Sequence, residues 1–279
     1  MNASFGNAPE LIIAVIALEK GLPDVVRGSI TGSVVSNLLL VLGLTIIAGA
    51  GEVDRRSLLP QLATIGIAVV LFLVPSIAGW GGDRNRHSLF IASIPVAAIL
   101  LLLYLGSTIR GLRRHGAQER PEAHATAWSL RLSVVVLAIA ATTTAFVSEA
   151  LVGSLEGFGH AIGWSEFFIA AVIVAIVGNA AEHGGAIVVA RRGKTKLASE
   201  IAISSAAQVA VFVAPAVTLL SIIRSHDFTL AFRPVEIATL AIATVLVALV
   251  VLDGRSSRRE GVALVGAYGG AVAAYALLA

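Results

Sequence analysis

The sequence predicts an all-α polytopic membrane protein built from two inverted five-helix repeats. Three observations predict it: an apolar composition, a series of about nine apolar segments, and a short motif that occurs twice. Hydrophobic residues make up 57% of the 279 residues and charged residues only 13%, whereas a soluble domain carries about 25% charged residues. So few charges cannot cover a surface that faces water, and we therefore expect the chain to lie in a lipid bilayer.

The apolar segments have about the length of membrane-spanning helices, which need roughly 20 residues. Charge clusters separate them. We expect helices at 5–20, 24–49, 58–79, 88–110, 128–151, 165–190, 197–223, 234–252 and 260–278, of which the first is unusually short and looks truncated. Membrane-spanning strands are not expected, because no ten-residue alternating pattern recurs.

The basic residues of the connections predict the orientation. The odd-numbered connections carry six basic residues, Lys20 and Arg27 among them, and the even-numbered connections carry fourteen, which accounts for all 20 Lys and Arg. Cytoplasmic loops carry an excess of Lys and Arg, so the even-numbered connections are expected inside and the C-terminus outside. The net charge of +3 then reflects these loops and does not indicate a nucleic-acid partner. Short loops and an Ala/Val/Arg-rich composition favour a prokaryotic plasma membrane.

A five-residue motif, Gly-Asn-Ala-Pro/Ala-Glu, occurs at 6–10 and again 172 residues later at 178–182. The two copies lie in the first and sixth predicted spans. Because five crossings separate them, they point in opposite directions through the membrane. Inverted repeats with interrupted helices are typical of secondary transporters. We assign 1–110 to the first repeat, 111–127 to a cytoplasmic linker and 128–279 to the second repeat.

The repeat also predicts a missing piece. In the second copy, 47 residues (131–177) precede Gly178 and hold one helix and the first half of the motif helix. Only five residues precede Gly6. Symmetry between repeats therefore predicts that about one helix and a half-helix are absent from the N-terminus, through a misassigned start codon or a fragment.

The glutamates of the two motifs are the main functional candidates. Glu10 and Glu182 each lie about 13–15 Å from the basic end of their helix, at 1.5 Å per residue, and half of the hydrocarbon core is about 15 Å. An unpaired charge near the midplane is costly by several kcal/mol. No Lys or Arg lies deep in any predicted span, so a structural ion pair has no partner. Asn7 and Asn179, three residues earlier, share the helix face of their glutamate.

Further oxygen atoms come from the spans that follow each motif. Ser33 and Asn37 follow the first motif, and Ser205 and Gln208 occupy nearly matching positions after the second. For Asn37 and Gln208, an interhelical hydrogen bond is about as expected as direct contact with an ion. For Gly28, Gly32 and Ser36 we expect close helix packing instead.

The candidate ligands are all oxygen atoms, which suits a hard cation such as Ca²⁺. A soft-metal site would need cysteine, which the chain lacks, or several histidines. One Ca²⁺ or two protons would neutralise the two glutamates, so the site is expected to exchange Ca²⁺ for H⁺ and to need no resident cofactor. His183 could pass protons or simply pack, and Glu149 could mark an entrance or be a solvated helix-end acid.

The segments Ser-Phe-Gly-Asn-Ala-Pro-Glu-Leu-Ile at 4–12 and Gly-Asn-Ala-Ala-Glu-His at 178–183 resemble the two signature motifs of the cation/proton exchanger family, within the calcium/cation antiporter superfamily. Further similarity covers most of the chain. The resemblance implies Ca²⁺/H⁺ antiport, with Glu10 and Glu182 as the ion-coupling acids. It also implies helper roles for four polar residues (Asn7, Asn179, Ser33 and Gln208), and that the family's N-terminal helix is lacking here.

Other functions remain as alternatives on the same scaffold. They are a Na⁺-coupled Ca²⁺ exchanger, a monovalent cation/H⁺ antiporter, and a fragment that does not transport. An intramembrane enzyme is not expected, since neither a His-Glu-x-x-His zinc pair nor a Gly-x-Ser-x-Gly nucleophile turn occurs. The oligomeric state is not indicated by the sequence.

Overall fold

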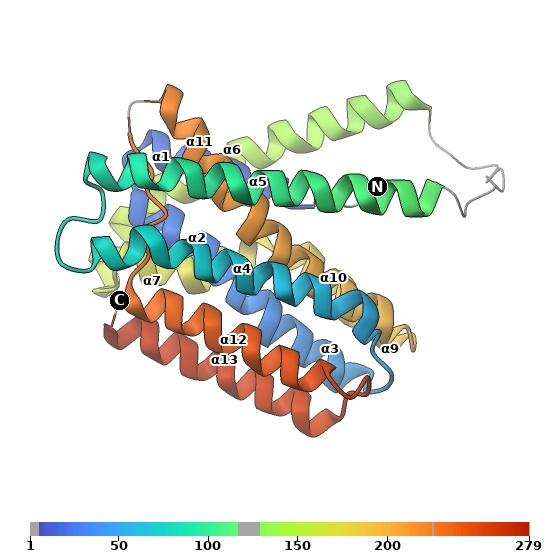
Figure 1. The fold of residues 1–279 in the computed structure, drawn as a ribbon. Helices are drawn as coiled ribbons and strands as arrows, with labels where there is room; N and C mark the ends of the chain where they lie inside the picture. The colour runs from blue at the N-terminus through green and yellow to red at the C-terminus, as the bar shows by residue number, and fades with distance from the viewer. Residues whose placement is uncertain (1–5, 117–128, 225, 279) are drawn as a thin grey trace.

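The computed structural model describes residues 6–116, 129–224 and 226–278, without the side chains of 111–116 and 130. In these ranges the chain is almost entirely helical, and the helices run roughly side by side (Figure 1). The β-structure described is one isolated bridge between Glu52 and Arg255. Most of the predicted inter-repeat linker at 111–127, and residues 1–5 before the first motif, lie outside the described residues.

The first repeat contains α1 (Ala8–Glu19), α2 (Pro23–Val35), η1 (Ser36–Val41), α3 (Leu42–Ala48), α4 (Arg55–Gly79) and α5 (His87–Gly116). The second repeat contains α6 (Leu130–Ile162), α7 (Glu166–Ile169), η2 (Ala170–Val174), α8 (Ala175–Gly178), α9 (Ala180–Arg191), α10 (Thr195–Gln208), η3 (Val209–Val213), α11 (Ala214–Leu220), η4 (Ser221–Ile223), α12 (Pro234–Val251) and α13 (Arg258–Leu278). Residues 23–48 form one continuous helical run, and so do residues 195–223.

Seven helical runs of the described chain are long and apolar enough to cross a membrane. The pair Glu166–Gly178 and Ala180–Arg191, bent by 54°, is an eighth candidate. Together with α1, which is short as expected, they follow the order of the predicted segments. The fold class is therefore confirmed: an all-α membrane protein.

The fifth predicted helix is longer than the sequence analysis expected. It was predicted to end at 151, but α6 continues to Ile162 and ends at Gly163, which has a left-handed backbone (φ 74°). Glycine adopts this conformation without the penalty of a Cβ and is a common helix terminator. Glu149 therefore lies well inside a helix and not near its outer end.

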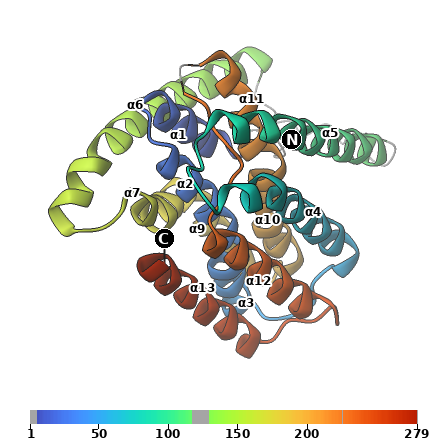
Figure 2. The same ribbon diagram turned by 60° about the vertical axis from the view of Figure 1, so that its left-hand side comes forward.

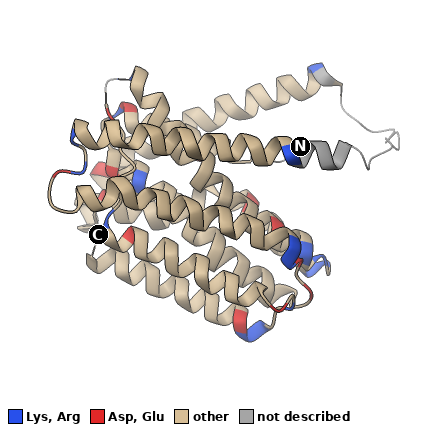
Figure 3. Cartoon of the chain, in the orientation of Figure 1, with Lys and Arg blue, Asp and Glu red and all other residues tan. Residues whose placement is uncertain are grey.

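The connections gather at two opposite ends of the bundle, as an alternating path requires. We call them the odd-loop end (20–22, 80–86, 163–165 and 224–233) and the even-loop end (49–54, 192–194 and 252–257). In the described chain, most of the charged residues lie near these ends (Figure 3). At the even-loop end Lys196 forms an ion pair of 2.8 Å with Glu52, and this partner holds the pKa of Glu52 below its usual value.

The run formed by α2, η1 and α3 is the centre of the bundle. In its most apolar window 83% of the residues are buried, compared with 6% for α6, which lies at the periphery (Figure 2). A Cβ on Gly32 would lie 2.1 Å from the carbonyl oxygen of Ala171, and one on Gly28 would lie 2.6 Å from that of Phe167. These two positions confirm the predicted close packing between the repeats.

Two π-helical turns, η1 and η3, occupy nearly equivalent places in the two repeats. With the 172-residue offset, η1 corresponds to residues 208–213, and η3 covers 209–213. A π turn adds one residue to the helix and is frequent at functional sites. The π turns therefore lie next to Asn37 and Gln208, the two amides whose positions differ by one residue between the repeats.

We predict that Gly32→Val strongly destabilises the protein, because an added side chain collides with the backbone of η2. Overpacking typically costs about 1–3 kcal/mol of stability. A collision with backbone atoms is not easily relieved by a change of side-chain rotamer. Thermal unfolding in detergent, followed by tryptophan fluorescence, measures the loss. Gly266→Ala on the exposed face of α13, where nothing lies within 4 Å of the added Cβ, is the control. Equal unfolding temperatures for the two variants would contradict the packing argument.

Candidate cation-binding site

The two motif asparagines have nearly the same backbone conformation at matching helix starts. Asn7 precedes α1 with φ −95° and ψ 19°, and Asn179 precedes α9 with φ −98° and ψ 9°. Neither side chain caps its own helix. Asn179 Nδ2 donates to the carbonyl oxygen of Ala175 at 2.8 Å, and both amides also bond across the bundle.

Each motif asparagine contacts the serine of the other repeat. Asn179 Nδ2 donates to Ser33 Oγ at 3.0 Å, and Ser205 Oγ lies 3.1 Å from Asn7 Oδ1. These two contacts are equivalent under the 172-residue offset, since 7 matches 179 and 33 matches 205. All four residues are buried. The inverted repeats thus interlock through one polar contact in each direction.

The remaining polar candidates extend the same cluster. Asn7 Nδ2 donates to Gln208 Oε1 at 2.8 Å, and Asn37 Nδ2 donates to Ser205 Oγ at 3.3 Å. Ser205 Oγ also lies 2.7 Å from Glu182 Oε2. Asn37 and Gln208 thus each make an interhelical hydrogen bond, and their direct contact with an ion stays a prediction.

The two glutamates lie near this cluster without a basic partner. Glu10 is only 5% exposed, and its Oε2 is buried with no hydrogen-bond partner. Glu182 is half-buried. Among the ion pairs of the described residues, none involves either glutamate.

A bound cation would depend on neutral oxygen atoms as well as on carboxylates. Within the described chain, no group of three or more His, Asp or Glu could hold a metal ion. The side-chain oxygen of Asn179 is buried and has no partner, like Glu10 Oε2. Amide, hydroxyl and carboxylate oxygens are ligands that suit Ca²⁺.

A cavity of about 300 Å³ reaches this cluster along one face of α10. Its lining residues are Glu182, Leu197, Glu200, Ile201, Ser204, Ser205 and Gln208. They recur every three or four residues, so the cavity runs from the even-loop end to Ser205 and Gln208. The sequence analysis missed Glu200, although its four-residue spacing from Ser204 places both on one helix face.

The two weaker candidates occupy different places. His183 is buried, and its Nε2 has no hydrogen-bond partner. Glu149 is exposed on α6 and is not among the residues that line the cavity. His183 therefore lies in the same helix turn as Glu182, and the entrance role of Glu149 stays a prediction.

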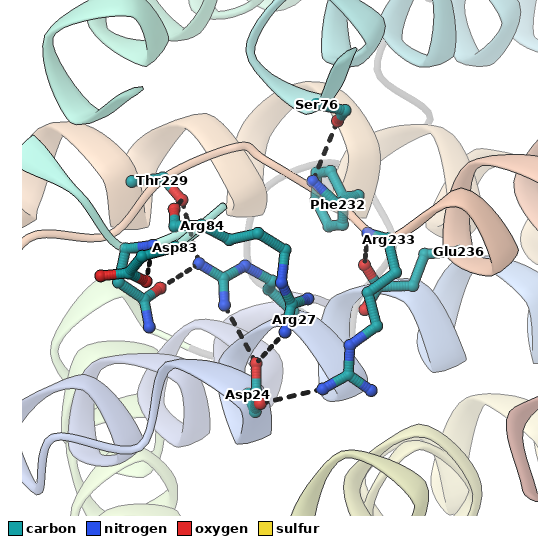
Figure 4. Close-up of polar contacts among 10 residues, drawn as sticks. Asp24, Arg27, Ser76, Asp83, Arg84, Thr229, Phe232, Arg233 and Glu236 are labelled. Carbon is teal, nitrogen blue, oxygen red and sulfur yellow. Dashed lines mark hydrogen bonds and ion pairs between the residues drawn. The ribbon is translucent and has the colours of Figure 1, made fainter. Parts of the chain in front are cut away.

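A charged cluster at the odd-loop end was also missed by the sequence analysis (Figure 4). Arg27 was counted among the residues of a connection, but it lies inside α2 and its side chain is 0% exposed. It pairs with Asp24 at 3.0 Å. Its other partners, Asn85 and Thr229, come from segments more than 50 residues away, which the local sequence cannot indicate.

We predict that Ser205→Ala destabilises the protein more than Ser33→Ala, because Ser205 contacts three polar groups and Ser33 one motif amide. A buried group left without its partner costs about 1–3 kcal/mol. A double-mutant cycle with Asn7→Ala, followed by thermal unfolding, measures the coupling, which is typically about 0.5–3 kcal/mol for residues in contact. Ser154→Ala, on the exposed face of α6, is the control. Additive effects of Asn7→Ala and Ser205→Ala would refute the contact.

Comparisons with known proteins agree with this architecture. The family model described as sodium/calcium exchanger protein matches residues 1–110 and 132–276. The Ca²⁺/H⁺ antiporter ChaA of Bacillus subtilis is 37% identical, over 96% of this chain and 80% of its own length. The vacuolar calcium ion transporter of Schizosaccharomyces pombe is 33% identical, over 99% of this chain and 70% of its own length.

Solved structures give the same result. Native YfkE has a TM-score of 0.84 and 35% identity, over 99% of this chain and 83% of that chain. The H⁺/Ca²⁺ exchanger CAX, at 18% identity and a TM-score of 0.69 over 99% of this chain and 75% of its own, shares the fold. The matched family model covers most of the chain, motifs included, and the chain therefore belongs to the sodium/calcium exchanger protein family.

Proposed function

We propose that the protein is a secondary active antiporter that exchanges Ca²⁺, or a similar divalent cation, for H⁺ across a membrane through Glu10 and Glu182. Its relatives in Bacillus subtilis and Aphanothece halophytica are named Ca²⁺/H⁺ antiporters. The interlocked motifs supply the two carboxylates, one from each repeat. We expect this pair near the midplane of the bilayer, where bare charge is most costly.

The contacts of Ser205 carry the proposal. Its hydroxyl lies 2.7 Å from Glu182 Oε2 and 3.1 Å from Asn7 Oδ1. A hydroxyl has one proton and can donate to only one of these acceptors at a time. If Glu182 is protonated, Glu182 donates to Ser205 and Ser205 donates to Asn7, so both contacts are hydrogen bonds. The geometry therefore suits a cation-free site that holds protons.

A cation would replace those protons. Two ionised carboxylates in an apolar environment repel each other and lack water, so the empty, doubly charged site is unfavourable. One divalent cation neutralises both groups, and so do two protons. Ca²⁺ takes six to eight oxygens in flexible geometry, and the motif amides supply neutral ones. If only the neutral loads allow the helices to rearrange, Ca²⁺ and H⁺ must move in exchange. His183, beside Glu182, is a further proton-coupling residue of this scheme.

The cavity along α10 gives the cation a path to Glu182. It starts at the even-loop end, which the excess of basic residues assigns to the cytoplasm, and the C-terminus then lies outside. Glu200 lines this path. Lys196, one turn earlier on α10, is bound to Glu52, and no partner of Glu200 is found among the described residues.

We predict that Glu10→Gln and Glu182→Gln each abolish proton-coupled Ca²⁺ uptake, because an amide neither releases a proton nor balances the cation charge. Vesicles with an imposed pH gradient, with and without Na⁺, measure the exchange. Glu156→Gln on the exposed face of α6 should transport normally. Retained exchange in either motif variant would refute the mechanism, and uptake that follows Na⁺ instead of pH would indicate sodium-coupled exchange.

We predict that Glu200→Gln weakens the apparent affinity for Ca²⁺ from the even-loop side while the maximal rate changes little, because Glu200 attracts the cation before it reaches Glu182. Initial rates over a range of Ca²⁺ concentrations separate the two parameters. Glu260→Gln, partly exposed on α13 and not among the residues that line the cavity, is the matched acid. An unchanged apparent affinity would exclude this role for Glu200.

A further inference from the structure

The charged cluster at the odd-loop end joins elements that are far apart in the sequence (Figure 4). Asp24 lies at its centre. Its Oδ1 is 3.0 Å from Arg27 and 3.6 Å from Arg84, and its Oδ2 is 3.0 Å from Arg233. One carboxylate thus connects α2 with the turn between α4 and α5 and with the start of α12.

Arg27 extends the same connections. It donates to Thr229 Oγ1 at 2.9 Å and to Asn85, and its guanidinium lies 5.6 Å from the centre of the Phe228 ring. Phe228 and Thr229 belong to the non-helical segment before α12, and both of these side chains are fully buried. The segment before α12 is therefore held against α2 by a charge that has no access to water.

A second carboxylate and an aromatic ring complete the cluster. Glu236 is 0% exposed, and its carboxylate accepts the backbone N–H of Arg233. The guanidinium of Arg233 lies 4.9 Å from the ring of Phe167 in α7. The cluster therefore also contacts the helical run that leads to Asn179.

The pairing of this cluster is incomplete. Four buried polar atoms have no hydrogen-bond partner: Arg27 Nε, Arg84 Nη1, Arg233 Nη1 and Glu236 Oε1. Buried groups without partners are costly, and several arginines share one aspartate. A buried ionic cluster is therefore weak evidence for stability, and this one can exchange partners or take up water with little loss of bonding.

The cluster lies above the candidate site, at the end opposite the cavity. From Asp24 to Ser33, α2 rises about 14 Å at 1.5 Å per residue. The cavity approaches from the even-loop end, past Leu197 and Glu200. The two ends of the bundle therefore differ. Buried charges hold α2, the α4–α5 turn and the start of α12 together at the odd-loop end, whereas a cavity opens along α10 toward the even-loop end.

We propose that the cluster formed by Asp24, Arg27, Arg84, Arg233 and Glu236 is a lock that closes the odd-loop end while the site is open to the even-loop end. This rests on the proposed antiport, which requires the site to face one side at a time. Opening the odd-loop end separates α2 and α7 from α12 and from the α4–α5 turn. The Asp24 ion pairs break in that step, and water enters toward Ser33.

Cysteine accessibility tests the lock, and the absence of cysteine from the sequence makes every introduced cysteine unique. Ser29→Cys reports on the odd-loop side, because Ser29 shares the helix face of Ser33 one turn nearer Asp24. Ser204→Cys reports on the cavity. The rates of modification by a charged thiol reagent are measured in lipid nanodiscs, with no transport required.

With the lock intact, we expect Ser204→Cys to react and Ser29→Cys to be protected. Asp24→Asn should raise the rate at Ser29→Cys at least several-fold and lower the rate at Ser204→Cys. Asp24→Glu keeps the carboxylate that the three arginines share and should keep Ser29→Cys protected. Asp227→Asn, which removes an exposed pair with His87 at the same end, should change neither rate.

Two results would overturn the lock. An unchanged rate at Ser29→Cys would show that the cluster does not close this end, and a rise at both cysteines would show that it supports the fold instead. If Asp24→Asn does not fold, Arg84→Gln removes the longest ion pair from a partly exposed side chain and should act in the same direction. Because the experiment measures cysteine labelling and not transport, the proposed lock can be refuted while Ca²⁺/H⁺ exchange is confirmed. The lock can likewise be confirmed while Ca²⁺/H⁺ exchange is refuted.

Discussion

The reciprocal contact between the two motifs is the constraint on which the rest of the structure depends. Each repeat supplies an asparagine that the serine of the other repeat holds, so neither half of the site forms without the other. This arrangement requires α2 to approach η2 so closely that only glycine fits at position 32. The close packing of the helices, the symmetry of the repeats and the position of the carboxylates therefore depend on one another.

Much of the fold could be predicted from the sequence because the bilayer imposes strong rules on it. The length of the apolar segments predicted the helices, and the alternation of charge between successive loops predicted the two ends of the bundle. The duplicated motif indicated that the two repeats are inverted. The end of α6 was missed, since apolar and small residues continue up to Gly163 and only the left-handed turn there stops the helix. The π turns were missed because a period of 3.6 residues does not reveal a locally wider turn.

The sequence predicted which residues form the candidate site better than it predicted the contacts between them. Repeat matching found the residues that carry the polar cluster, but hydrogen-bond partners depend on rotations that no spacing fixes. Glu200 and Arg27 were missed for a related reason. Each is a single charge near a helix end in the sequence, and only the fold shows that one lines a cavity and the other is buried against Thr229.

Proton release on cation binding tests the central claim most directly. The purified protein is titrated with Ca²⁺ in a weakly buffered solution that contains a pH indicator, and the protons released are compared with the Ca²⁺ bound. Because one divalent cation replaces the protons on Glu10 and Glu182, the account predicts release that approaches two protons per Ca²⁺ below the pH at which both groups ionise. Ca²⁺ that binds at the same pH without releasing protons would contradict it.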